Sequence, residues 1–138
     1  MKNKIQTGIW IDGSKAIIIS FSEGEKTVTE IEAEIDNPKY HEKEGDKGTF
    51  VGTHHVNKEK NFEERRRNQT EAFLEEVLDS LVNTDEIYIF GPGEIKVQLK
   101  KKIINNKNRI KGKLMAMDTA DYISLNQMVA QTKEFYNI

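Results

Sequence analysis

The sequence predicts one α/β domain built on a mixed five-stranded sheet, with the strand order 3-2-1-4-5 and helices on both faces. Three observations support this prediction. The first quarter of the chain contains three strand patterns separated by short polar turns, which is typical of an antiparallel meander. The second half contains two strands that are each followed by an amphipathic helix. A Gly-Pro-Gly turn joins one of these strands to its helix within residues 86–104.

The meander is expected to begin with a strand from Ile5 to Asp12 and to continue with an apolar strand from Ala16 to Phe21. The segment Asp12-Gly13-Ser14 is a strong turn signal between them. The third strand is expected over Thr27–Ile35, where apolar and threonine residues alternate with glutamates. A strand with one charged face is typical of a sheet edge.

From residue 36 to about residue 60 the hydrophobic periodicity disappears, and proline, glycine and dense mixed charge take its place. Connections of this length are usually functional or disordered, so we expect a long mobile loop here. All three histidines of the chain, His41, His54 and His55, lie in it. Adjacent histidines of an extended segment face opposite sides and their spacing fits no zinc pattern, so a polar loop is favoured over a metal site.

A long helix is expected from Asn61 to about Val82, since Asn61 and Glu64 have the spacing of a capping box. Its core face is predicted to comprise Phe62, Gln69, Phe73, Leu74, Val77, Leu78 and Leu81. Three successive arginines fall in the expected first turns, where cations oppose the helix dipole. They are therefore interpreted as ligands for an external anion rather than as helix-stabilising residues: Arg65, Arg66 and Arg67.

The second half begins with the buried strand pattern at residues 87–90, followed by the turn Gly91-Pro92-Gly93 and a helix. A helix N-terminus can receive an anion, but Glu94 follows the turn directly and would repel one, so the turn is interpreted as a packing element. A fifth strand is expected over Gly112–Asp118. A final helix is expected after a second capping box, with this inner stripe: Leu125, Met128, Val129, Thr132 and Phe135. The resulting order, βββαβαβα, is that of the ribonuclease H-like architecture.

Composition favours a single domain of 138 residues without disulfides, since the chain has no cysteine. No apolar run approaches the roughly 20 residues of a membrane span, so we expect a cytoplasmic protein with no membrane contact. The formal net charge of −2 is unevenly distributed along the chain. The stretch between Glu94 and Asp118 holds eight basic and no acidic residues, and the remainder of the chain therefore sums to −10.

The third strand, the long charged loop, the arginine-rich helix and the segment EIYIFGPGEIKVQL together resemble the central domain of the class-1 release factors of eukaryotes and archaea and of Pelota. The resemblance covers nearly all of residues 1–138, as a stand-alone domain of a bacterial type. Release factors carry a GGQ tripeptide in the loop, whereas this sequence has HEKEGDKGTFVGTHH there and no GGQ. The resemblance therefore implies association with RNA or the ribosome but not peptidyl-tRNA hydrolysis.

The leading hypothesis is a binding module without catalytic activity or cofactor, whose partner is ribosomal RNA or a ribonucleoprotein. Besides the three arginines, its expected contacts are Lys96, Lys100, Lys101, Lys107 and Arg109. A first alternative is a nuclease that uses Mg²⁺ or Mn²⁺ held by Asp12, Asp118 and Glu71. A second alternative is a protein-interaction domain that pairs through its edge strand. The oligomeric state is left open.

Overall fold

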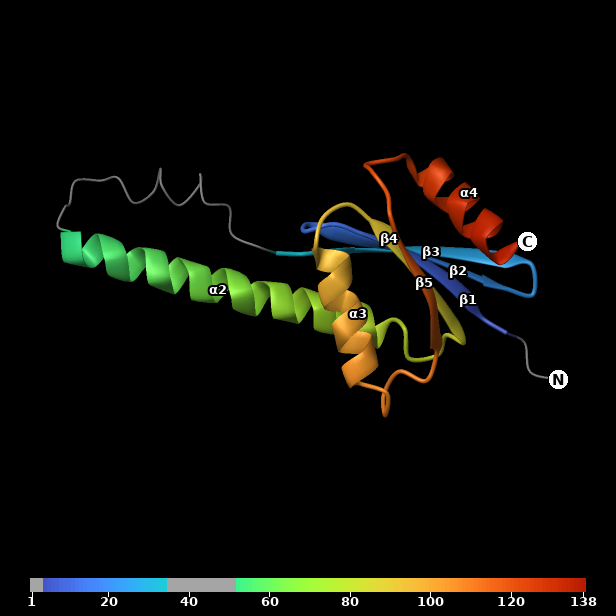
Figure 1. Ribbon diagram of the computed structural model, residues 1–138, viewed down its shortest axis with the longest axis horizontal. Coiled ribbons are helices and arrows are strands. Elements are labelled where there is room, and N and C mark those ends of the chain that lie inside the picture. The colour runs from blue at the N-terminus through green and yellow to red at the C-terminus, as the bar shows by residue number, and fades with distance from the viewer. Residues whose placement is uncertain (1–3, 35–51) are drawn as a thin grey trace.

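The computed structural model describes residues 4–34 and 52–138 (Figure 1). Within these ranges a five-stranded sheet has the order β3-β2-β1-β4-β5, as predicted. Its strands are β1 (Gln6–Ile11), β2 (Lys15–Ser22), β3 (Glu25–Glu32), β4 (Glu86–Gly91) and β5 (Lys113–Thr119). The helices are α2 (Gly52–Asp79), α3 (Ile95–Asn105) and α4 (Leu125–Tyr136).

The first three strands form the expected antiparallel meander, and β4 and β5 are parallel to β1. The β2–β3 connection is a two-residue turn in which Glu23 and Gly24 have φ values of 54° and 81°. Positive φ at both positions is the mark of a type I′ turn, whose twist matches that of the hairpin strands. The β1–β2 turn is held by Asp12, whose Oδ1 accepts hydrogen bonds from the backbone N–H groups of Ser14 and Lys15, each at 2.8 Å.

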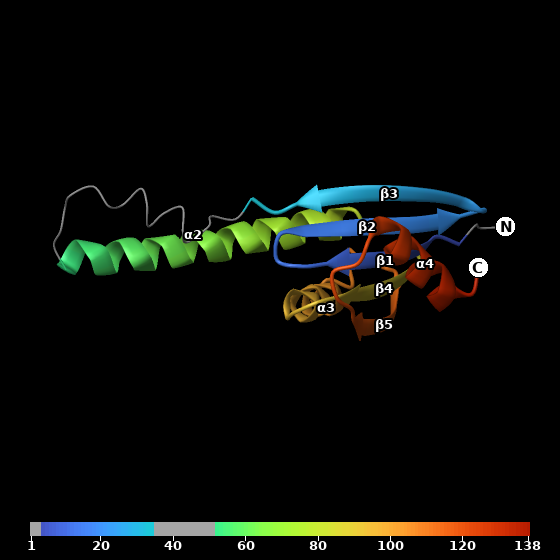
Figure 2. The same cartoon turned by 90° about the horizontal axis from the view of Figure 1, so that it is seen from above.

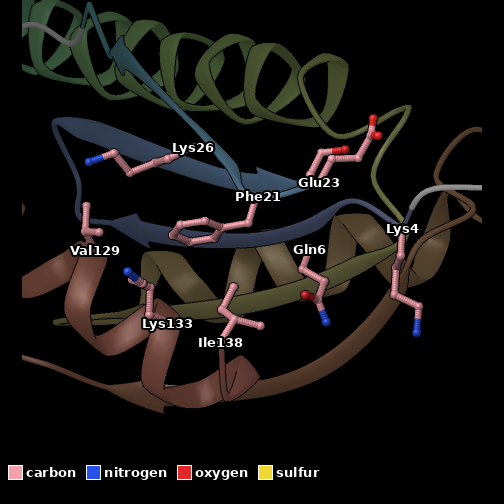
Figure 3. A pocket seen from close by; sticks show the side chains of 10 residues that line it. Lys4, Gln6, Phe21, Glu23, Lys26, Val129, Lys133 and Ile138 are labelled. Carbon is pink, nitrogen blue, oxygen red and sulfur yellow. The ribbon is translucent and has the colours of Figure 1, made fainter.

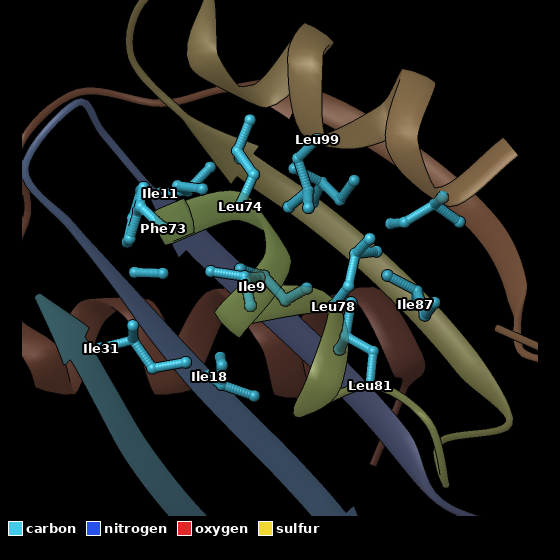
Figure 4. Packing of buried hydrophobic residues seen from close by; sticks show 14 of the residues in the cluster. Ile9, Ile11, Ile18, Ile31, Phe73, Leu74, Leu78, Leu81, Ile87 and Leu99 are labelled. Atoms are coloured by element: carbon cyan, nitrogen blue, oxygen red, sulfur yellow. The ribbon is translucent and has the colours of Figure 1, made fainter. Parts of the chain in front are cut away.

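The sheet is covered by α2 and α3 on one face and by α4 on the other (Figure 1). Because side chains alternate along a strand, Ile9 and Ile11 pack against Leu74 and Leu78 of α2 and Leu99 of α3 (Figure 4). The intervening side chains point to the opposite face, where they form a second cluster with α4: Trp10, Ile17, Ile19, Phe21, Tyr88, Phe90 and Met128.

The first residue of β4, Glu86, ties this strand to the beginning of β1. Its carboxylate accepts hydrogen bonds from Gln6 Nε2 at 2.9 Å and from Lys4 Nζ at 3.3 Å. These hydrogen bonds, that from Gln6 first, lower the pKa of Glu86 below its usual value. The carboxylate is therefore more stable in the folded protein than in the unfolded chain.

The position of α4 depends on Gly8, because a Cβ atom there would lie 2.4 Å from Thr132 Oγ1. The predicted capping box is confirmed, with Ser124 Oγ accepting from the Gln127 N–H and the Gln127 side chain accepting from the Ser124 N–H. The predicted inner stripe is correct only in part. Met128 and Thr132 are buried, but Leu125, the first residue of α4, is 48% exposed and Phe135, in its last turn, is 36% exposed.

The predicted start of the long helix is wrong: α2 begins at Gly52, not at Asn61. Residues 52–61 lack an apolar face and contain few strong helix formers, so neither periodicity nor helix propensity predicts a helix there. The part of the predicted 36–60 loop from residue 52 onward is therefore helical. Its first part, with His41, lies outside the described residues. The strand predicted over Thr27–Ile35 is β3, which begins two residues earlier and ends at Glu32.

Within the two described ranges no helix has the length and apolar character needed to cross a membrane.

Candidate nucleic-acid interface

The first half of α2 extends away from the body of the protein (Figures 1 and 2). The helix is about 42 Å long, from 28 residues at 1.5 Å each. From residue 60 onward, where the burial of the side chains is described, the first buried one is Phe73, and residues 52–68 form a projecting segment of roughly 25 Å, which we call the arm. The arm contains five basic and three acidic residues, a net charge of +2. A helical segment with so few apolar residues gains little stability from burying an apolar face.

The three predicted arginines lie on the arm, and all three are exposed. Successive residues of a helix point about 100° apart, so Arg65, Arg66 and Arg67 spread around the helix instead of converging on one point. The guanidinium carbon of Arg66 lies 6.0 Å from the ring centroid of Phe62, one turn earlier. The arm thus presents cations to more than one side.

The dipole argument for these arginines is wrong. They lie 13 to 15 residues after Gly52, and the effect of a helix dipole on a charge fades beyond the first turn. What distinguishes them is instead their place on a segment that leaves the body of the protein. This is a feature of tertiary structure, and the helix boundary predicted from sequence concealed it.

The second half of α2, which packs on the body of the protein and which we call its root, carries a row of three acidic residues. They pair with two cations of the basic stretch, Lys102 and Arg109. Glu71, Glu75 and Asp79 are spaced four residues apart, which places them along one side of the helix. Lys102 Nζ lies 2.5 Å from Glu71 Oε2 and 3.0 Å from Glu75 Oε2. Arg109 lies 2.8 Å from Glu75 Oε1 and also pairs with Asp79. The spacing of these acids at i, i+4 and i+8 is the signal in the sequence that could have indicated an acidic helix face for the basic stretch to pair with.

These ion pairs shift the titration of their members in the directions expected for a charged cluster. Hydrogen bonds from Arg109 and then from Lys102 lower the pKa of Glu75. The hydrogen bond to Glu71 is the main cause of the raised pKa of Lys102. Both cations are therefore held charged by α2, and Arg109, predicted to contact nucleic acid, already has two carboxylate partners.

The other predicted lysines divide into one that is buried and three that remain at the surface. Lys96 is only 7% exposed, and its Nζ donates a hydrogen bond to the Gly93 carbonyl at 2.5 Å. It closes the turn before α3 and does not belong to the basic surface, contrary to the prediction. Lys101 and Lys107 are exposed and Lys100 is half-buried, so these three still present charge near the root of the arm.

The Gly91-Pro92-Gly93 turn lies where β4 passes the end of β1. Gly91 has a φ of 150°, and a Cβ atom there would lie 2.3 Å from the carbonyl oxygen of Ile11. The Gly91 carbonyl accepts a hydrogen bond from the N–H of Ala120 at 3.1 Å, which ties the turn to the end of β5. These contacts fit the interpretation of the turn as a packing element. The N-cap of α3, Glu94, makes no side-chain capping hydrogen bond.

The three carboxylates of the nuclease alternative do not converge. Trp10, Phe90 and Asp118 lie side by side on β1, β4 and β5, and Asp12 follows two residues later, so the Cα atoms of Asp12 and Asp118 are about 12 Å apart. Glu71 lies on α2, across the sheet from the α4 face that Asp118 joins. Among the described residues no three histidine or acidic side chains are grouped to hold a metal ion.

Asp118 instead belongs to a hydrogen-bond network beneath α4. Its Oδ2 accepts from the Tyr88 hydroxyl at 2.7 Å, and Gln131 Nε2 donates to the same hydroxyl at 2.9 Å. Burial, together with the neighbouring carboxylate, raises the pKa of Tyr88 to about 12. The prediction that His54 and His55 lie in a loop is wrong, because both fall within the helix α2.

A cavity of about 440 Å³ lies at the far end of the meander from the arm (Figure 3). The β2–β3 turn, the beginning of β1 and α4 line this open pocket, with Phe21, Val129 and Ile138 as its apolar residues and the lysines Lys4, Lys26 and Lys133 around it. The cavity shares none of the residues of the arm or of α3. It is therefore separate from the candidate interface.

The fold and this site define an α/β domain that carries a basic helical arm. A similar fold occurs in the Pelota protein of Thermoplasma acidophilum, with a TM-score of 0.56 and 10% identity over 96% of this chain and 32% of that one. It also occurs in an archaeal translation termination factor, aRF1, with a TM-score of 0.52 and 16% identity over 96% and 40%. This chain thus spans about a third to two-fifths of these proteins. No protein-family model and no curated protein matches the sequence.

Proposed function

We propose that this protein is a translation-related module, without catalytic activity, that binds ribosomal RNA through the arm of α2 and the neighbouring surface of α3. The observation that carries the proposal is the exposed Arg65-Arg66-Arg67 sequence on a helix segment that leaves the protein body. Arginine suits this task because its planar guanidinium binds phosphate oxygens in a bidentate manner and is weakly hydrated.

The shape of the arm supports an RNA partner. A projecting helix reaches a groove or a backbone ridge that the flat face of a sheet would not reach. Arginines that point in several directions can contact phosphates on both sides of the helix, as is needed when a helix lies between two strands. The exposed Lys101, on α3, and Lys107, just after it, extend the basic surface onto the body of the protein.

The fold supports a role in translation, because the two similar structures are a Pelota protein and a translation termination factor. The acidic residues at the root of α2 limit which cations can contact RNA. Since Lys102 and Arg109 are neutralised by Glu71, Glu75 and Asp79, the contact is expected to be made by the arm and the outer lysines only.

Co-sedimentation with purified ribosomes tests the proposal. The protein is expected to pellet with ribosomes at low salt and to be released at high salt, because phosphate contacts displace counterions. Arg67→Glu should weaken the association by about tenfold. Lys133→Glu is the matched control, since it changes the charge equally at an exposed helical position on α4. No association at low salt, or equal losses in both variants, would refute the proposal.

A further inference from the structure

The outer edge of β3 has no paired strand within residues 4–34 and 52–138. β3 is the terminal strand of the sheet (Figure 2), and none of the described residues pairs with its outer side. Seven of its eight residues are exposed, with Ile31 as the buried one. An eight-residue edge strand without a bulge or proline offers a row of backbone donors and acceptors to another strand.

The hairpin geometry identifies which backbone groups point outward. In a two-residue type I′ hairpin the flanking pair, here Ser22 and Glu25, is hydrogen-bonded, and hydrogen-bonded pairs recur at every second residue. The same parity is visible beyond the strand, where the Ala33 N–H donates to the Ser14 carbonyl at 2.8 Å. The backbone N–H and C=O groups of the odd-numbered residues of β3 therefore point towards β2. The N–H and C=O groups that point outward belong to Lys26, Val28, Glu30 and Glu32.

We infer that this edge pairs with the β3 strand of a second copy of the chain, antiparallel and with the two-fold axis at Val28. In this register Lys26 of each copy lies opposite Glu30 of the other, and Thr27 lies opposite Thr29. Val28, which is 38% exposed in the single chain, packs against its own counterpart. Opposite charges and threonine pairs at directly facing positions stabilise antiparallel strands.

The other symmetric registers are less favourable. A two-fold axis at Lys26 or Glu30 places like charges opposite each other, and such pairs are destabilising. An axis at Thr27 or Thr29 sets Val28 against a charged side chain. The register centred on Val28 is thus selected by charge complementarity, and it gives a continuous ten-stranded sheet in which both β3 edges are paired. It uses no residue of the arm, so it is independent of the proposed RNA contact.

Sedimentation velocity over a range of protein concentrations tests the inference. The mass should rise from 15.9 kDa towards twice that value. Lys26→Glu and Glu30→Lys should each weaken the dimer by about tenfold, since each turns two attractive pairs into repulsive ones. The double variant, which has the composition of the natural chain, should restore the dimer. This charge exchange is specific to the proposed register.

Val28→Pro gives a second comparison that does not involve charge. It removes an outward N–H but no β2–β3 hydrogen bond, and edge strands tolerate proline. The monomer should keep its circular dichroism spectrum while the dimer is lost. A mass of 15.9 kDa at every concentration, or a dimer that none of these substitutions weakens, would overturn the inference. A dimer that the double variant does not restore would do so as well.

Discussion

Gly91→Ala is expected to destabilise the protein much more than Gly93→Ala, although both substitutions add one methyl group to the same turn. Both glycines have φ values in the left-handed half of the map, 150° and 70°, which cost an alanine about 1–2 kcal/mol. At Gly93 the new Cβ meets no atom within 4 Å. At Gly91 it would lie 2.3 Å from the Ile11 carbonyl oxygen, so the buried end of β1 must move, which costs about 1–3 kcal/mol more.

The two free energies of unfolding can be measured by urea denaturation, with Trp10 as the probe. It is the single tryptophan of the chain and is 1% exposed, so its fluorescence reports on the sheet. We expect losses of about 1–2 kcal/mol for Gly93→Ala and about 2–5 kcal/mol for Gly91→Ala. Equal losses in the two variants would refute the close approach of β4 to β1 as the reason for a glycine at position 91.

Three further predictions concern α4 and the sheet. Gly8→Ala should cost about 1–3 kcal/mol in urea denaturation, and Thr132→Ala in the same chain should recover part of that loss, whereas additive losses would contradict the contact. The stability contributed by Tyr88 should be lost as the pH rises from about 10 towards 12, and ultraviolet titration should show a lower Tyr88 pKa in Asp118→Asn. Because folding lowers the pKa of Glu86, the stability that its carboxylate contributes should be lost as the pH falls below about 4.3. The free energy of unfolding of Glu86→Gln should therefore depend less on acid pH than that of the natural protein, and an equal dependence would contradict this role.

The strand order could be predicted because short turns, strand patterns and amphipathic helices follow one another along the sequence, and each of them indicates one kind of connection. Short turns after apolar runs require neighbouring antiparallel strands, and a right-handed crossover places each later strand next to β1 or β4. The capping box at Ser124 marks the beginning of α4 because its two side chains satisfy backbone N–H groups there. These features depend on residues close together in the sequence.

The candidate site could be predicted only in part, because it depends on which charges meet in three dimensions. The basic stretch has no acid within it, yet Arg109 is paired with Glu75, 34 positions earlier in the chain. Lys96 is buried because it returns to the Gly93 carbonyl, a contact set by the turn geometry. The arm was hidden for another reason: a polar helix without an apolar face lacks the periodicity by which helices are recognised.

The salt dependence of ribosomal RNA binding is the most direct test of the central claim, that the arm holds RNA through its arginines. The logarithm of the binding constant should fall linearly with the logarithm of the salt concentration. In the variant Arg66→Glu with Arg67→Glu the slope should be smaller by about two, one unit for each lost phosphate contact, and it should be unchanged in Lys133→Glu. A slope that is the same in the arm variant and in the natural protein would contradict the account.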